Sequence, residues 1–106
     1  MSLQSTITYR AIADETASAE LLAAVPLKSI VVTGMIISAD AASSVVFKTE
    51  DGSGAAISST LYLAAGSTMS LPPNYDGWFS TVAGEALYAT ITITGNMSFM
   101  FTYRLV

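Results

Sequence analysis

The residue types that could perform chemistry are few in this chain, and their spacing assembles no familiar reactive site. Histidine is absent, which removes the commonest general base and the commonest metal ligand. Cysteine is also absent, so the chain has neither disulfides nor a thiolate nucleophile. Serine is plentiful, but it has no histidine or cysteine partner, and no G-x-S-x-G elbow occurs. The sequence therefore predicts a protein that is not an enzyme and has no catalytic residues.

Carboxylates are the remaining candidates, because a pair of acids can hydrolyse a glycosidic bond. The acids that fall in predicted turns, where solvation is their ordinary fate, are Asp14-Glu15, Glu50-Asp51, Asp76 and Glu85. Calcium is an alternative for Glu50-Asp51 and Asp76, since it takes hard oxygen ligands, but no D-x-D-x-D-G loop accompanies them. We expect no metal and no cofactor.

The glycine motifs and the aromatic residues each allow two interpretations. The segments Gly52-Ser-Gly54 and Gly84-Glu85-Ala86 are predicted to be turns and not phosphate loops, because neither precedes a Lys-Ser/Thr pair or a helix. Trp78 and the five tyrosines could form a platform on which sugars stack. Burial is favoured for Trp78, because it precedes a strand within an apolar cluster, and Gly77 lets the backbone turn the indole inward.

Two segments near the end of the chain have the alternation of half-buried strands. The strand that begins at Leu87 has one apolar face and one face of Tyr and Thr, and Met97 to Leu105 alternates in the same way. The predicted core residues are Trp78, Phe79, Leu87, Ile91, Ile93, Phe99 and Phe101. The predicted turn glycines are Gly52, Gly54, Gly77 and Gly84.

The rest of the chain also has the pattern of short strands. They are predicted over Ser5 to Ala13, Ala19 to Val25, Leu27 to Ala39, Ser44 to Glu50, Ala55 to Ser58, Thr60 to Ala64 and Ser67 to Leu71. The second of these competes with a helix, which the Ala, Glu and Leu content favours. The strand over Leu27 to Ala39 is apolar on both faces. One face is predicted to hold Leu27, Val31, Met35 and Ile37, and the other Ile30, Val32 and Ile36. Turns every 8–12 residues or so indicate an all-β antiparallel sandwich or barrel in a single domain, residues 1–106, with residues 1–4 as a flexible N-terminus.

Composition excludes some partners and favours others. The net charge is −4 and the four basic residues are scattered, so no basic patch exists to bind nucleic acid. The longest apolar stretch, Ile30 to Ile37, is far below the about 18 residues that a membrane span needs. With 52% apolar and only 11% charged residues, the chain is expected to bury surface against partners and to self-associate.

Several segments resemble small structural proteins of tailed bacteriophages. They are Leu61-Tyr-Leu-Ala-Ala-Gly, Ser70-Leu-Pro-Pro-Asn-Tyr-Asp-Gly-Trp-Phe-Ser-Thr and Ala83-Gly-Glu-Ala-Leu, within a likeness that extends from about Ala19 to Val106. The most specific parts are Gly77-Trp78-Phe79 and Gly84-Glu85-Ala86-Leu87. The resemblance implies a jelly-roll β-sandwich carried on the virion, and it transfers no functional residues.

The expected function follows from this resemblance. We expect a capsid decoration (cement) protein that binds the major capsid protein at capsomer junctions and stabilises the mature shell. We expect it to be a homo-oligomer, namely a trimer that matches three-fold points of the shell. Its place would be the exterior of the capsid, after assembly in the host cytoplasm. The alternatives are a tail or fibre adhesion module that binds host surface carbohydrate and, third, a cellular jelly-roll enzyme or carbohydrate-binding module.

Overall fold

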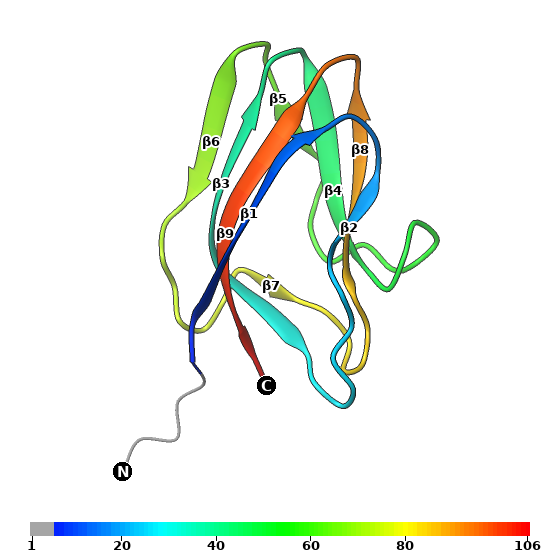
Figure 1. Ribbon diagram of the computed structural model, residues 1–106, viewed down its shortest axis with the longest axis vertical. Coiled ribbons are helices and arrows are strands. Elements are labelled where there is room, and N and C mark those ends of the chain that lie inside the picture. Colours follow the sequence, from blue (N-terminus) through cyan, green and yellow to red (C-terminus); the bar gives the residue numbers. More distant parts are fainter. Residues whose placement is uncertain (1–5) are drawn as a thin grey trace.

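The computed structural model describes residues 6–106 and shows two antiparallel β-sheets packed face to face (Figure 1). The expectation of a flexible N-terminus, residues 1–4, lies outside the described residues. The strands are β1 (Thr8–Glu15), β2 (Ala19–Leu22), β3 (Ile30–Ala39), β4 (Ser43–Thr49), β5 (Leu61–Leu63), β6 (Ser67–Leu71), β7 (Phe79–Ser80), β8 (Leu87–Ile93) and β9 (Met97–Leu105).

The order of the strands is that of a jelly roll. The first sheet has the order β1-β9-β3-β6, with the short β7 also paired to β3, and the second sheet has the order β2-β8-β4-β5. All the strand pairs are antiparallel. Eight strands wound in this way between two sheets define the jelly roll. The predicted fold class, an all-β antiparallel sandwich of jelly-roll type, is confirmed.

The core lies between the two sheets and is built from alternate residues of the central strands. Phe47 of β4 is fully buried, stacks on Phe79 with ring centroids 4.9 Å apart, and meets Phe99 edge-on at 6.1 Å. Leu87, Ile91, Phe99 and Phe101 are buried around this cluster, and Phe79 and Ile93 pack against it. The predicted core is therefore confirmed except for Trp78, which is described below.

Most predicted strands are present, with two informative differences. The segment Ala19–Leu22 is a strand and not a helix, because pairing with β8 buries Leu21 in the core. The prediction of a strand over Ala55 to Ser58 was wrong, because this segment makes only an isolated bridge, between Lys48 and Ala56. One reason is that the Ser58 hydroxyl accepts the hydrogen bond of the Phe47 amide, where a ladder would need a backbone carbonyl.

A bulge in β3 changes which of its residues face the core. Its register against β9 shifts between Val32 and Gly34, and one extra residue reverses the alternation of side chains. Ile30 and Val32 before the bulge therefore share the core with Met35 and Ile37 after it, so the predicted division of this strand into two faces was wrong. Only Ile36 of this group faces solvent. Leu27 was also placed wrongly, because β3 begins at Ile30 and Leu27 lies in the preceding turn.

The predicted turn glycines lie in turns or beside them, and two of them show why a side chain is excluded. Gly77 has a φ of 89°, and a Cβ there would overlap the Val31 side chain. A Cβ on Gly54 would overlap the carbonyl oxygen of Thr49. Gly84 has a φ of 82°, and Gly52 lies in the turn that follows β4.

We expect Phe47→Ala to lower the free energy of unfolding by about 3–5 kcal/mol, because it removes the ring that two other aromatic rings contact and leaves a cavity. Urea denaturation of the variant and the wild type measures this. Tyr62→Ala is the matched control, since Tyr62 is 80% exposed and its loss should cost less than about 1 kcal/mol. Equal losses in the two variants would contradict the central place of Phe47.

Candidate interaction surface

The acidic residues do not come together. Among residues 6–106, no group of three or more His, Cys, Asp or Glu side chains is placed to hold a metal ion. Asp51 is committed to its own turn, where its carboxylate accepts hydrogen bonds from the hydroxyl and the amide of Ser53, which lower its pKa. Glu85 accepts a hydrogen bond from the Thr49 hydroxyl at 2.7 Å. The prediction of turn positions was wrong only for Asp14 and Glu15, which end strand β1.

The outer face of the first sheet has an uncharged, apolar centre. Ala11 of β1 and Ile36 of β3 both pair with Met100 of β9, so the three side chains form one row across three strands. Met100 is 44% exposed and Ile36 is 40% exposed. We name this row the apolar row. The outward residues beside it on β9 and β3 are Ser98, Thr102, Gly34 and Ser38, none of which is charged.

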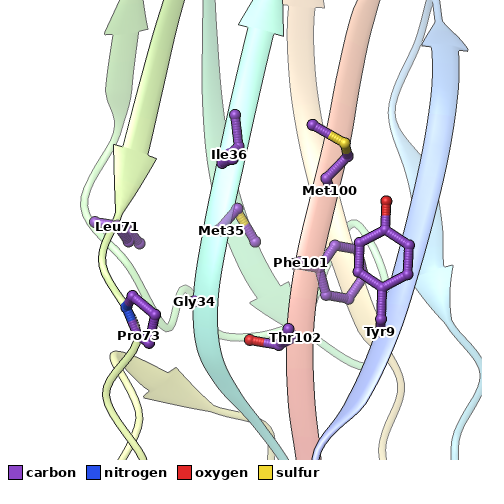
Figure 2. Close-up of a pocket in the computed structure, with 9 residues that line it drawn as sticks. All are labelled: Tyr9, Gly34, Met35, Ile36, Leu71, Pro73, Met100, Phe101 and Thr102. Atoms are coloured by element: carbon purple, nitrogen blue, oxygen red, sulfur yellow. The ribbon is translucent and has the colours of Figure 1, made fainter.

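Two hollows lie on this face, separated by the side chains of Ile36 and Met100. The first, here called the groove, is lined on its outer side by Tyr9, Gly34, Ile36, Pro73, Met100 and Thr102, and Figure 2 shows Tyr9 and Pro73 on opposite sides of it. Gly34 provides no side chain, and a Cβ there would lie only 3.2 Å from Thr102 Oγ1 and 3.6 Å from Pro73 Cα. The second, here called the Ala11 hollow, is lined mainly by Ala11, Ala13, Ile36, Ser38, Ser98 and Met100.

Trp78 was predicted to be buried, and this was wrong, because its side chain is 43% exposed. Neighbouring residues of an extended segment point to opposite faces, and Phe79 takes the inward position by stacking on Phe47. The indole is therefore left outside. Its Nε1 donates a hydrogen bond to the Pro72 carbonyl at 2.8 Å, which satisfies the one polar atom of the ring.

The loop that carries Trp78 is fixed to the first sheet by backbone and side-chain contacts. The amides of Asn74 and Trp78 donate to the carbonyls of Thr33 and Val32, respectively. On the neighbouring strand, the Arg104 guanidinium lies 4.5 Å from the centre of the Tyr75 ring, and its Nε donates to the Tyr75 carbonyl at 2.7 Å. The loop thus presents partly exposed aromatic rings beside one cation.

Sequence reasoning did not single out the apolar row. One signal was present, because Met100 stands between Ser98 and Thr102 on the face opposite Phe99 and Phe101, where a polar residue is ordinary. Ile36 could not be assigned to the same face, since the bulge in β3 decides its direction. Tyr9 lies within the predicted first strand, Ser5 to Ala13, but only the pairing with β9 brings it to the groove.

Comparisons of the chain with protein-family models, with curated proteins and with solved structures found no match. Within residues 6–106, no helix has the length and apolar character to cross a membrane. The jelly roll and the outer face of its first sheet are therefore the features on which the proposal below is based.

We expect the fluorescence of Trp78 to be quenched readily by acrylamide in the native protein, because 43% of the side chain is in contact with solvent. Trp78→Phe should lower the free energy of unfolding by only about 1 kcal/mol, the value of its hydrogen bond to Pro72, and not by the about 3–5 kcal/mol of a buried ring. Steady-state quenching and urea denaturation measure the two quantities. A blue-shifted emission that acrylamide leaves unchanged would show that the indole is buried after all.

Proposed function

We propose that this protein is a non-enzymatic structural protein of a tailed bacteriophage virion, namely a capsid decoration protein. It binds the outside of the mature shell where capsomers meet and buries its surface against the major capsid protein. A closed trimer, which matches the three-fold points of an icosahedral shell, is the assembly that we propose. No nucleic acid and no membrane is involved in this role.

The observation that carries the proposal is the uncharged, apolar centre of the outer face of the first sheet. Ala11, Met100 and Ile36 form an apolar row on a strand-built surface that cannot change shape easily. A protein interface needs such a centre, because each unpaired charge that is buried costs binding free energy. Charged residues make up only 11% of the whole chain, so the protein provides little electrostatic steering for small charged ligands.

Fold and sequence pattern support the phage assignment by analogy. The jelly roll occurs in viral capsid proteins, although it also occurs in lectins and cupins. The segments that resemble phage structural proteins occupy structural positions here. Gly77 has a positive φ beside Val31, Phe79 stacks in the core, and Leu87 is fully buried. A pattern of this kind marks structural positions and not a reactive site.

The proposed contact explains how such a protein would stabilise a shell. A packed sandwich is a rigid body, so binding it across a joint between capsomers resists the separation of those capsomers. The Ala11 hollow accepts an apolar side chain of the shell, and Ser38 and Ser98 in its lining supply hydrogen bonds. Because the centre of the contact is uncharged, salt should change its affinity little.

A second candidate is the carbohydrate-binding adhesion module, which the exposed aromatic residues favour. Trp78 is 43% exposed and Tyr75 is 36% exposed, and both belong to the loop after β6. Sugars stack on such rings. This surface lies on the loop and not on the apolar row, so substitutions can separate the two functions.

We expect the purified protein to sediment with undecorated mature capsids at low and at high salt, with a copy number that matches the shell symmetry. Ala11→Lys should weaken this binding by more than about tenfold, because it buries an unpaired charge at the centre of the contact. Thr92→Lys is the matched control, since it adds the same charge on the exposed side of β8 in the second sheet. Capsid pelleting followed by counting copies per particle measures both.

Three outcomes would overturn the proposal. They are absence from the capsid pellet at both salt concentrations, a copy number of only a few per virion, and equal binding by Ala11→Lys and the wild type. Binding to host polysaccharide that is lost in Trp78→Ala and kept in Ala11→Lys would instead establish the adhesion function.

A further inference from the structure

Leu27 combines two features that are unfavourable in an isolated molecule. The turn in which the Lys28 amide donates to the Val25 carbonyl has Pro26 at its second position and Leu27 at its third. Leu27 has a φ of 64°, a conformation that a turn of this kind ordinarily gives to glycine or asparagine. Its side chain is also 90% exposed. A leucine that is both strained and exposed at the tip of a turn gains nothing from its position within the isolated molecule.

The surroundings of Leu27 hold it in place and extend its apolar surface. The Gly84 amide donates to the Lys28 carbonyl, and Ser29 and Val106 exchange two backbone hydrogen bonds. Val82 and Val106 are 57% and 48% exposed at this same end of the sandwich. The tip is therefore a fixed apolar projection, and ordering it on binding costs little conformational entropy.

The groove on the outer face is the complementary shape on the same chain. Its outer lining has no charged side chain, and the hollow between Pro73 and Tyr9 has the apolar walls that suit an aliphatic side chain (Figure 2). Leu27 cannot reach the groove of its own molecule. It precedes β3, whereas Gly34 lies roughly 20 Å further along this largely extended part of the chain.

One pair of opposite charges lies beside the two surfaces. Lys28 directly follows the projecting leucine and is exposed. Asp76 is exposed in the loop that continues from Pro73 at the rim of the groove. The neighbouring Arg104 is already engaged with Tyr75. Two copies of a chain with a net charge of −4 repel each other in general, so a contact that is uncharged at its centre and allows Lys28 to approach Asp76 is the favourable one.

We infer that copies of this protein associate tip to groove, with Leu27 of one copy seated in the groove of the next. The contact joins two different surfaces, so each copy both inserts a leucine and accepts one, and the chain of contacts closes into a ring if the rotation between copies allows it. The Ala11 hollow lies on the other side of Met100 and stays available to a shell protein. This inference does not depend on capsid binding, because the association occurs in solution without capsids.

Sedimentation velocity of the full chain and its variants tests the inference. We expect the wild type to form species heavier than a monomer, and Leu27→Gly and Tyr9→Lys each to be monomeric alone. Leu27→Gly lacks the inserted side chain but keeps the groove, whereas Tyr9→Lys has lost one wall of the groove but keeps the tip. Mixing the two variants should restore a one-to-one complex, because one intact tip and one intact groove then remain.

Two controls separate this contact from loss of the fold. Leu27→Gly should have the same Tm as the wild type or a higher one, since glycine adopts a positive φ without strain. Tyr62→Lys makes the same change of residue on the second sheet, at a side chain that is 80% exposed, and should associate like the wild type.

The inference fails if the wild type is monomeric up to about 1 mM, the weak end of specific affinities. It also fails if Leu27→Gly associates as the wild type does. Finally, it fails if the mixture of Leu27→Gly and Tyr9→Lys contains only monomers, since a face-to-face contact between identical surfaces is not restored by mixing.

Discussion

The stacking of Phe79 on Phe47 is the contact on which much of the arrangement depends. It joins the short β7 to the middle of the second sheet, with 4.9 Å between the ring centroids. Because it fixes the direction of residue 79, it also turns Trp78 outward, where the indole Nε1 donates a hydrogen bond to the Pro72 carbonyl. The loop before β7 is then held along β3, where Gly77 can pass Val31 only because it has no side chain. One stacked pair of rings thereby fixes the course of an exposed loop.

The bulge in β3 has a comparable effect on the other surface. Without it, Ile30, Val32 and Ile36 would share one face, so either Ile36 would point into the core or Ile30 and Val32 would leave it. With it, both halves of the strand contribute to the core, and the residue that faces solvent lies beside Met100. The bulge also brings Gly34 to the floor of the groove. A local irregularity of one residue thus supplies both a full core and a hollow on the surface.

Sequence patterns predicted those parts of the fold in which local alternation and burial agree. The strand Met97–Leu105 and the short strand Ser67–Leu71 have the predicted bounds, and the core positions on β8 and β9 are confirmed because one face of each is continuously apolar. The prediction for Trp78 was wrong because its place in an apolar cluster does not reveal that its neighbour Phe79 takes the inward direction. The row of Ala11, Met100 and Ile36 could not be predicted, since it is formed by pairing between distant strands and by a bulge, neither of which a local pattern contains.

The place of β9 in the first sheet determines when this protein can fold during its synthesis. The strand lies between β1 and β3, and β8 lies likewise between β2 and β4, so both sheets are completed by segments that are made late. During synthesis, β1 has no neighbour in its sheet until β9 has emerged from the ribosome. The earlier strands must therefore wait with apolar side chains and open edges in solvent, a period in which chaperones and neighbouring nascent chains compete for them. Folding of this jelly roll is accordingly an event that follows synthesis of its last strand, with a rate limited by contacts between distant parts of the chain.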